Sequence, residues 1–180
     1  MSDGNMVFFE LKPGDPPPPV LALPPGMVMR IWQPASRGLP PSGSRTFDNY
    51  IWWLFTRLRV FATNEFTELT VWQDGRKVHR LVVSPRWHRS PFMGSDDLEV
   101  GNMWTLPEAR GQKLAHTIIG EAHRLFSDRE RRWWWLTEVD NAPSVAIAAR
   151  CRYRPIGAGC KTRPLGIGIW GQYILQPKGD

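Results

Sequence analysis

The segment from Thr105 to Ala115 has a residue pattern that is suited to binding a ligand. It reads Thr-Leu-Pro-Glu-Ala-Arg-Gly-Gln-Lys-Leu-Ala, so an expected strand ends, the chain turns, and an expected helix begins on small residues. Such a turn directs several backbone N–H groups to one place, and the helix dipole adds positive potential there. Gly111 and Ala115 allow a ligand to approach the backbone closely. The segment therefore predicts an anion site, most naturally for a phosphate.

A second segment, Trp135–Ser144, has an expected strand followed by Asn141 and by Ser144 at the head of a short helix. The two segments resemble motifs A and B of the GNAT superfamily of N-acyltransferases. In motif A a Gln/Arg-x-x-Gly-x-Gly/Ala loop follows a strand. Arg110 and Ala115 occupy the ends of that loop, and Lys113 stands where the family usually has its central glycine. The resemblance covers roughly residues 65–175.

The resemblance implies a GNAT fold and an acetyl-CoA-dependent N-acetyltransferase that transfers the acetyl group directly to a primary amine. It implies that a backbone N–H on the strand before the loop polarises the thioester carbonyl. It also implies that Asn141 binds the pantetheine arm, with Ser144 nearby. The expected cofactor-binding residues are Met103, Trp104, Thr105, Arg110, Gly111, Gln112, Lys113, Leu114, Ala115, Asn141 and Ser144.

The leading candidate for a general base is Glu99, because an amine must be neutral to attack. Glu99 lies six residues before Thr105 on the same expected strand, and this even spacing predicts that both side chains share one face. A solvated or salt-bridged strand residue is the alternative. Asn102 is a second catalytic candidate, with the histidines His79 and His88 as weaker ones. Ala148 stands where the family often has a tyrosine that acts as general acid for the leaving thiolate, so the general acid stays unassigned.

The acceptor is the part of the reaction on which the sequence says least. The loop Arg86-Trp87-His88-Arg89 combines cations with an aromatic ring, which suits an anionic amine such as a nucleotide-linked amino sugar. Trp53, Arg86 and His88 are the expected substrate-binding residues. Three alternatives stay open: a peptide or protein amine, a degenerate fold that senses acyl-CoA, and a nucleic-acid binder.

Composition narrows these alternatives. The net charge is +6 and the pI about 9.8, yet no run of five or six Lys/Arg occurs, so nucleic acid is not favoured. Cys151 and Cys160 form no CxxC pair, and no signal peptide is evident, which predicts a cytoplasmic protein. No apolar stretch reaches the ~20 residues that span a bilayer. His116 and His123 lack further ligands, so no metal is expected. A small-molecule amine is the expected partner, and a homodimer is left open.

The elements that must position these residues follow from turn signals and periodicity. Residues 1–45 are Pro-rich and are expected to pack as a lead-in on an acyltransferase domain at 46–180. Helices are expected at 47–61, 108–126 and 143–151. Strands are expected at 6–11, 27–33, 67–73, 77–83, 98–106, 133–139, 154–160 and 167–175, with Asp74-Gly75 as a hairpin turn. The strand–helix–strand unit at 98–139 predicts one parallel pair. The fold class is therefore α/β (α+β), with a mixed, mostly antiparallel sheet flanked by helices. The resemblance implies in addition that the parallel strands at 98–106 and 133–139 are splayed to admit the pantetheine arm of CoA.

Overall fold

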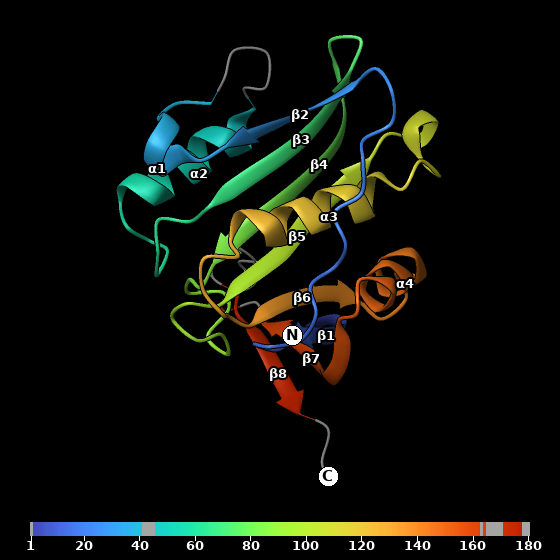
Figure 1. Cartoon of the computed structure of the whole chain (residues 1–180). Helices are drawn as coiled ribbons and strands as arrows, with labels where there is room; N and C mark the ends of the chain where they lie inside the picture. Colours follow the sequence, from blue (N-terminus) through green and yellow to red (C-terminus); the bar gives the residue numbers. More distant parts are fainter. Residues whose placement is uncertain (1, 41–45, 163, 165–170, 178–180) are drawn as a thin grey trace.

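A computed structural model of the chain describes residues 2–40, 46–162, 164 and 171–177. Within them, eight strands form one sheet in the order β2-β3-β4-β5-β6-β1-β7-β8 (Figure 1). Neighbouring strands are antiparallel except β5 and β6, which are parallel. The predicted mixed sheet with one parallel pair is confirmed. The strands are β1 Ser2–Leu11, β2 Met27–Trp32, β3 Thr67–Gln73, β4 Arg76–Pro85, β5 Leu98–Thr105, β6 Trp133–Glu138, β7 Arg154–Thr162 and β8 Tyr173–Pro177; the helices are α1 Pro34–Arg37, α2 Phe47–Arg57, η1 Pro107–Ala109, α3 Leu114–Leu125 and α4 Ala142–Arg150.

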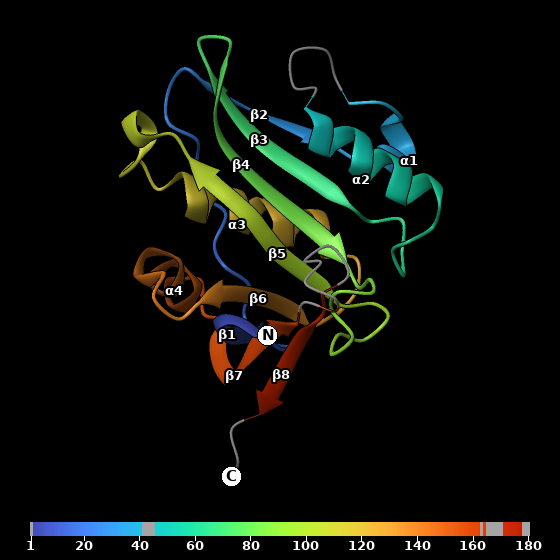
Figure 2. The same cartoon turned by 180° about the vertical axis from the view of Figure 1, so that it is seen from behind.

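The N-terminal segment supplies two strands of this sheet. β1 lies between β6 and β7, whereas β2 lies at the far edge beside β3. The Pro-rich stretch between them passes over α3 (Figures 1 and 2). It comes so close that a Cβ on Gly120 would lie 2.3 Å from the backbone oxygen of Pro19. Gly120 therefore sets how closely this stretch can pack against α3.

The hairpin between β3 and β4 follows the sequence prediction. Asp74 and Gly75 have φ angles of 49° and 75°, which is the left-handed pair that a tight two-residue turn requires. The two strands pair from Thr67–Val83 to Gln73–Arg76, and they lie between β2 and β5 in the sheet.

The helix predicted at 108–126 begins later than expected. Residues 107–109 form one turn of 3-10 helix, and α3 starts at Leu114. Gly111 has φ 80° and Lys113 has φ 59°, and such left-handed backbone interrupts a right-handed helix. The residues between the two helical pieces therefore form a loop that stands in front of the α3 N-terminus.

The helix predicted at 47–61 ends at Arg57, and its N-cap is Thr46. Thr46 and Asn49 form the reciprocal hydrogen bonds of a capping box. Asn49 also donates a 2.7 Å hydrogen bond to the buried carboxylate of Glu68, which forms salt bridges with Arg80 at 3.0 Å and with Lys77 at 3.8 Å. This buried polar network ties the start of α2 to β3 and β4.

The face that α2 buries also differs from the prediction. The spacing of Tyr50, Leu54, Leu58 and Phe61 predicts one buried stripe, but Tyr50, Leu54 and Leu58 are exposed. Phe61, beyond the helix end, is buried. The face that packs on the sheet instead carries aromatic rings: Trp52 stacks on Phe66 with centroids 5.2 Å apart. Larger rings bury more apolar area per side chain, so they outcompete the leucines for the sheet.

The last two strands are shifted from their predicted ranges. β7 runs to Thr162, two residues past its predicted end. β8 begins at Tyr173, whereas the prediction started at 167, and residues 165–170 lie outside the described part of the chain.

The two faces of the α2 region can be tested with a matched pair of substitutions. Phe61→Ala removes a ring that is 6% exposed, so we expect a loss of about 3–5 kcal/mol in unfolding free energy. Leu58→Ala removes a side chain that is 64% exposed, so we expect a change within about 0.5 kcal/mol. Urea denaturation of both variants measures this, and equal losses would contradict the observed packing of α2.

Candidate active site

The site begins where the parallel strands separate. β5 and β6 pair at only three positions: Leu98–Trp133, Glu99–Trp134 and Val100–Trp135. Beyond Val100, β5 continues with β4 and β6 continues with β1, so the two strands diverge (Figure 2). An open cleft of about 750 Å³ lies in the gap, bounded by β5, α3, β6 and α4. The predicted splay is therefore present as a cleft.

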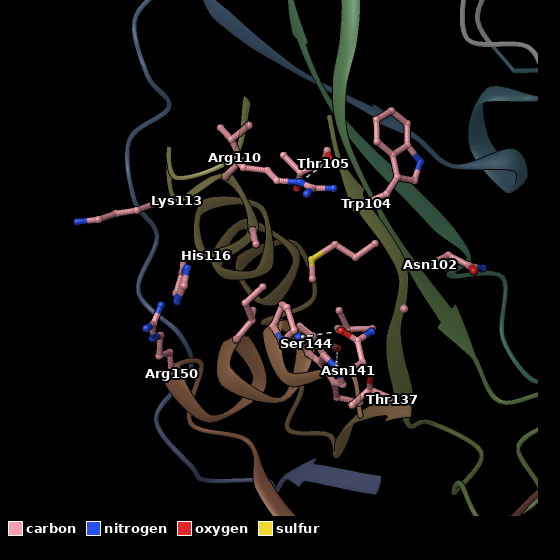
Figure 3. A pocket seen from close by; sticks show the side chains of 18 of the residues that line it. Asn102, Trp104, Thr105, Arg110, Lys113, His116, Thr137, Asn141, Ser144 and Arg150 are labelled. Atoms are coloured by element: carbon pink, nitrogen blue, oxygen red, sulfur yellow. Dashed lines mark hydrogen bonds between the residues drawn. The ribbon is translucent and has the colours of Figure 1, made fainter. Parts of the chain in front are cut away.

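A bulge in β5 decides which side chains face this cleft. Arg80 pairs with Trp104 and Val82 with Gly101, so two steps along β4 match three along β5. The extra residue is accommodated at Asn102, whose φ is 47°. Figure 3 shows Thr105 and Trp104 on opposite sides of β5.

The bulge overturns the prediction that Glu99 and Thr105 share a face. Val100 belongs to the core beneath α3, and Met103, three residues on, packs against that same core. Alternation along the strand therefore puts Thr105 on the α3 face and Glu99 on the opposite face. Even spacing fails here because it assumes a regular strand.

Ten of the eleven predicted cofactor residues line the cleft. They are Met103, Trp104, Thr105, Arg110, Gly111, Lys113, Leu114, Ala115, Asn141 and Ser144; Gln112 is not among the lining residues. Asn102 also lines it, although Figure 3 shows its side chain directed away from the other labelled residues. Sequence reasoning missed Gly101, Thr137, His116 and Arg150. His116 lies in the first turn of α3, three residues after Lys113, and this short spacing from the loop could have indicated it.

The charges of the cleft have one sign. The cationic side chains among the lining residues are Arg110, Lys113 and Arg150. Figure 3 shows Arg110 beside Thr105, Lys113 extending outward, and Arg150 next to His116. None of the lining residues in the described part of the chain is acidic. Burial, with further contributions from Arg150 and Lys113, lowers the pKa of His116. Positive side chains gathered at a helix N-terminus without a carboxylate make a site for a polyanion.

The opposite wall of the cleft is fixed by α4. The Asn141 side-chain oxygen accepts a hydrogen bond from the backbone N–H of Ser144 at 3.3 Å, which caps the helix. The Trp135 indole donates a 3.1 Å hydrogen bond to the hydroxyl of Ser144. With its oxygen used in capping, the amide NH₂ of Asn141 is the donor that remains for a ligand.

Glu99 stands just beyond the inner end of the cleft. The buried Ser90 donates a 3.0 Å hydrogen bond to Glu99 Oε2. Burial raises the pKa of Glu99 to about 7, against the opposing effects of the Ser90 hydrogen bond and the Arg89 charge. Glu99 is not a lining residue itself, but a Cβ on the lining residue Gly101 would lie 3.5 Å from its Oε1.

The histidines and the other reactive groups of the region are held in structural contacts. His79 Nδ1 lies 2.7 Å from the Thr105 hydroxyl, and burial lowers the pKa of His79 to about 4, so its ring is neutral near pH 7. His123 is hydrogen-bonded to the Tyr153 hydroxyl at 2.8 Å. Burial raises the pKa of the Cys151 thiol to about 11. Imidazoles whose pKa burial holds far below 7 are weak bases, and an un-ionised thiol is a weak nucleophile, so these groups are poor candidates for the chemistry.

The predicted substrate residues do not line the cleft. Trp53 lies on α2 with the Arg57 guanidinium 5.8 Å from its ring centre. Arg86 accepts a backbone hydrogen bond from Ala62 at 2.8 Å, and His88 is exposed, with its carbonyl oxygen bonded by Gln172. Trp53 is thus part of α2, and Arg86 and His88 belong to the loop after β4. The role of the three residues stays a prediction.

The described residues contain neither a metal-binding cluster nor a membrane-spanning helix. No group of three His, Cys, Asp or Glu side chains is placed to hold a metal ion among them. No helix in the same ranges is long and apolar enough to cross a membrane.

Comparison with known structures finds the same fold. A tandem GNAT protein from the clavulanic acid biosynthesis pathway is similar with a TM-score of 0.56 and 15% identity, over 84% of this chain and 50% of that one. A putative GNAT acetyltransferase from Novosphingobium aromaticivorans is similar with a TM-score of 0.54 and 18% identity, over 86% of this chain and 61% of that one. A GCN5-related N-acetyltransferase from Sphaerobacter thermophilus is similar with a TM-score of 0.56 and 14% identity, over 88% of this chain and 51% of that one. The chain thus spans about half to three-fifths of the length of these proteins.

Comparison of the sequence gives the family. No curated protein sequence matches the chain. The profile of the Acetyltransferase (GNAT) family matches residues 27–153, which include the whole cleft from Val100 to Arg150. With that match, and with a sheet that opens at its parallel pair, the chain belongs to the GNAT acetyltransferase family.

Proposed function

We propose that the protein is an N-acetyltransferase that uses acetyl-CoA to acetylate a primary amine of a small molecule. The observation that carries this proposal is the cleft at the β5–β6 divergence, whose charged lining residues within the described ranges are all basic. Coenzyme A is a polyanion with a long, narrow pantetheine arm. A cationic mouth that narrows between two strands is suited to that shape and charge.

Each wall of the cleft would hold a different part of the cofactor. The phosphates would lie at the α3 N-terminus, beside Arg110, Lys113 and Arg150. The arm would run between the unpaired edges of β5 and β6, with the Asn141 amide as a donor along it. Backbone N–H groups of β5 at and after Gly101, which β6 leaves unpaired, would polarise the thioester carbonyl.

Glu99 would accept the proton of the attacking amine. As the C–N bond forms and the C–S bond breaks, one amine proton passes to the carboxylate, and the leaving sulfur takes a proton from solvent. A carboxyl with a pKa near 7 is well matched to this task at neutral pH, because it is both ionised in part and basic enough. Its place on the face opposite α3 separates the acceptor side of the sheet from the cofactor-phosphate side.

The acceptor would enter on the Glu99 face. The loop that supplies Ser90 to Glu99 also carries Arg86, His88 and Arg89, so an acceptor amine at Glu99 would have cations near its other end. This supports an amine that bears an anionic group, such as an amino-sugar phosphate.

The cofactor site is tested by calorimetric titration with acetyl-CoA. We expect Lys113→Ala to weaken binding roughly fivefold, because about 1 kcal/mol of charge interaction at the helix N-terminus is lost. Arg59→Ala is the matched control. Arg59 is also basic and exposed and also has a left-handed backbone, with φ 53°, but it lies after α2 and does not line the cleft. Equal affinities for both variants, or no binding of acetyl-CoA by the wild-type chain, would refute the proposed site.

The general base is tested by kinetics with a panel of primary amines and detection of the released thiol. We expect Glu99→Gln to lower the rate by about 10²–10⁴-fold without changing acetyl-CoA affinity. In the wild type, kcat/KM should rise with pH through about 7, because Glu99 must lose its proton to act. Binding of acetyl-CoA without turnover of any amine would indicate an acyl-CoA sensor instead.

A further inference from the structure

The carboxylate of Glu99 is held asymmetrically. Oε2 accepts the 3.0 Å hydrogen bond from Ser90, whereas Oε1 is directed to the side of Gly101, where a Cβ would lie 3.5 Å away. Gly101 lines the cleft at the position where β5 leaves β6. One oxygen is therefore occupied by the protein, and the other borders the space where the strands separate.

Ser90 is itself fixed. It is fully buried, its N–H donates to the Trp87 carbonyl at 3.0 Å, and its carbonyl accepts from Met93 at 3.2 Å. A hydroxyl held by a turn of this kind has little freedom to follow a moving carboxylate. It restricts Glu99 to the rotamer that keeps Oε2 bonded.

The loop around Ser90 is attached to the far edge of the sheet. The backbone N–H of Tyr173 donates to the Arg89 carbonyl at 2.8 Å, and the Gln172 side chain donates to the His88 carbonyl at 3.0 Å. β8 thus supports the loop that supports Glu99. The contact between Ser90 and Glu99 therefore depends on a strand that begins more than 70 residues further along the chain.

We propose that Ser90 is a positioning residue for the general base: it holds Oε2 of Glu99 and so leaves Oε1, beside Gly101, to take the proton of the acceptor amine. This inference rests on the proposed role of Glu99. It adds that Gly101 is required beside Oε1 as open space, so that the amine can reach that oxygen.

The electrostatic setting of Glu99 gives the direction of the effect. The Ser90 hydrogen bond and the Arg89 charge lower the pKa of Glu99, while burial raises it. Tyr173, on β8, is the other titratable group coupled to Glu99, and its own pKa is raised by burial and by the charges of Glu99 and Glu138. Removing the Ser90 hydroxyl while these remain should raise the pKa of Glu99 further.

The test is a carboxyl-carbon NMR titration of the full-length chain with ¹³C-labelled glutamate, in which Glu99→Gln assigns the resonance. We expect Ser90→Ala to move the Glu99 titration upward by about one pH unit, the usual effect of losing a hydrogen bond to a charged group. Ser90→Cys keeps the size and a weaker donor, so its shift should be smaller. Ser84→Ala is the control, because Ser84 pairs with Glu99 across β4 and β5 without a hydroxyl bond to it.

Kinetics give a second readout that a merely structural role would not produce. The same acceptor amine is used for this variant as for Glu99→Gln. The kcat of Ser90→Ala should be several-fold below that of the wild type at pH 7 and should approach the wild-type value at pH 9, while the KM for acetyl-CoA stays unchanged. Gly101→Ala should lower kcat/KM most for amines branched next to nitrogen. An unchanged Glu99 titration and pH profile in Ser90→Ala, while Glu99→Gln is inactive, would overturn the role of Ser90 and leave the base intact. Full activity in Glu99→Gln would overturn the base itself.

Discussion

The parallel pairing of β5 with β6 stops after three residue pairs, and most of the functional geometry depends on this limit. Had the strands stayed paired to Thr105, the sheet would be continuous and the cleft would not exist. Because they part after Val100 and Trp135, backbone groups of both strands face open space. The sheet stays intact around the gap because β4 pairs with β5 on one side and β1 pairs with β6 on the other.

The aromatic and basic residues near the gap divide between two tasks. Trp133 and Trp135 belong to the core beneath α3, and Trp134 lies on the other face against Phe92 at 4.8 Å. These rings anchor β6 on both faces of the sheet, although its edge toward β5 is unpaired beyond Trp135. The cations of the cleft, by contrast, repel one another: after burial, which is the largest cause, the charges of Arg150 and Lys113 also lower the pKa of His116. Part of that repulsion would be relieved by an anionic ligand, so the site is built for binding at some cost to the folded chain.

The two faces of the sheet separate two kinds of chemistry. On the α3 face, a helix N-terminus and side-chain cations favour negative charge. On the other face, Glu99 is withdrawn from water, and its pKa rises because burial opposes ionisation more than Ser90 and Arg89 support it. β5 contributes to both faces because its side chains alternate, and the bulge at Asn102 shifts that alternation so that Met103 and Thr105 lie on the α3 face. Thr105, on the α3 face, is then held by the neutral ring of His79.

Local residue types and periodicity are enough to predict the order of the strands, the tight Asp74-Gly75 turn and the parallel pair. They extend the helix of α3 back to residue 108, whereas the left-handed backbone of Gly111 and Lys113 makes a loop there. The sequence also indicated ten residues that line the cleft, since they lie in two contiguous segments. Only the tertiary structure decided the side on which Glu99 lies, because the bulge has no signal in residue spacing. The exposed stripe of α2 required the structure too, since two apolar faces competed and ring size decided between them. The contact of Ser90 with Glu99 joins a loop to a strand through three-dimensional packing, which a pattern along the chain does not record.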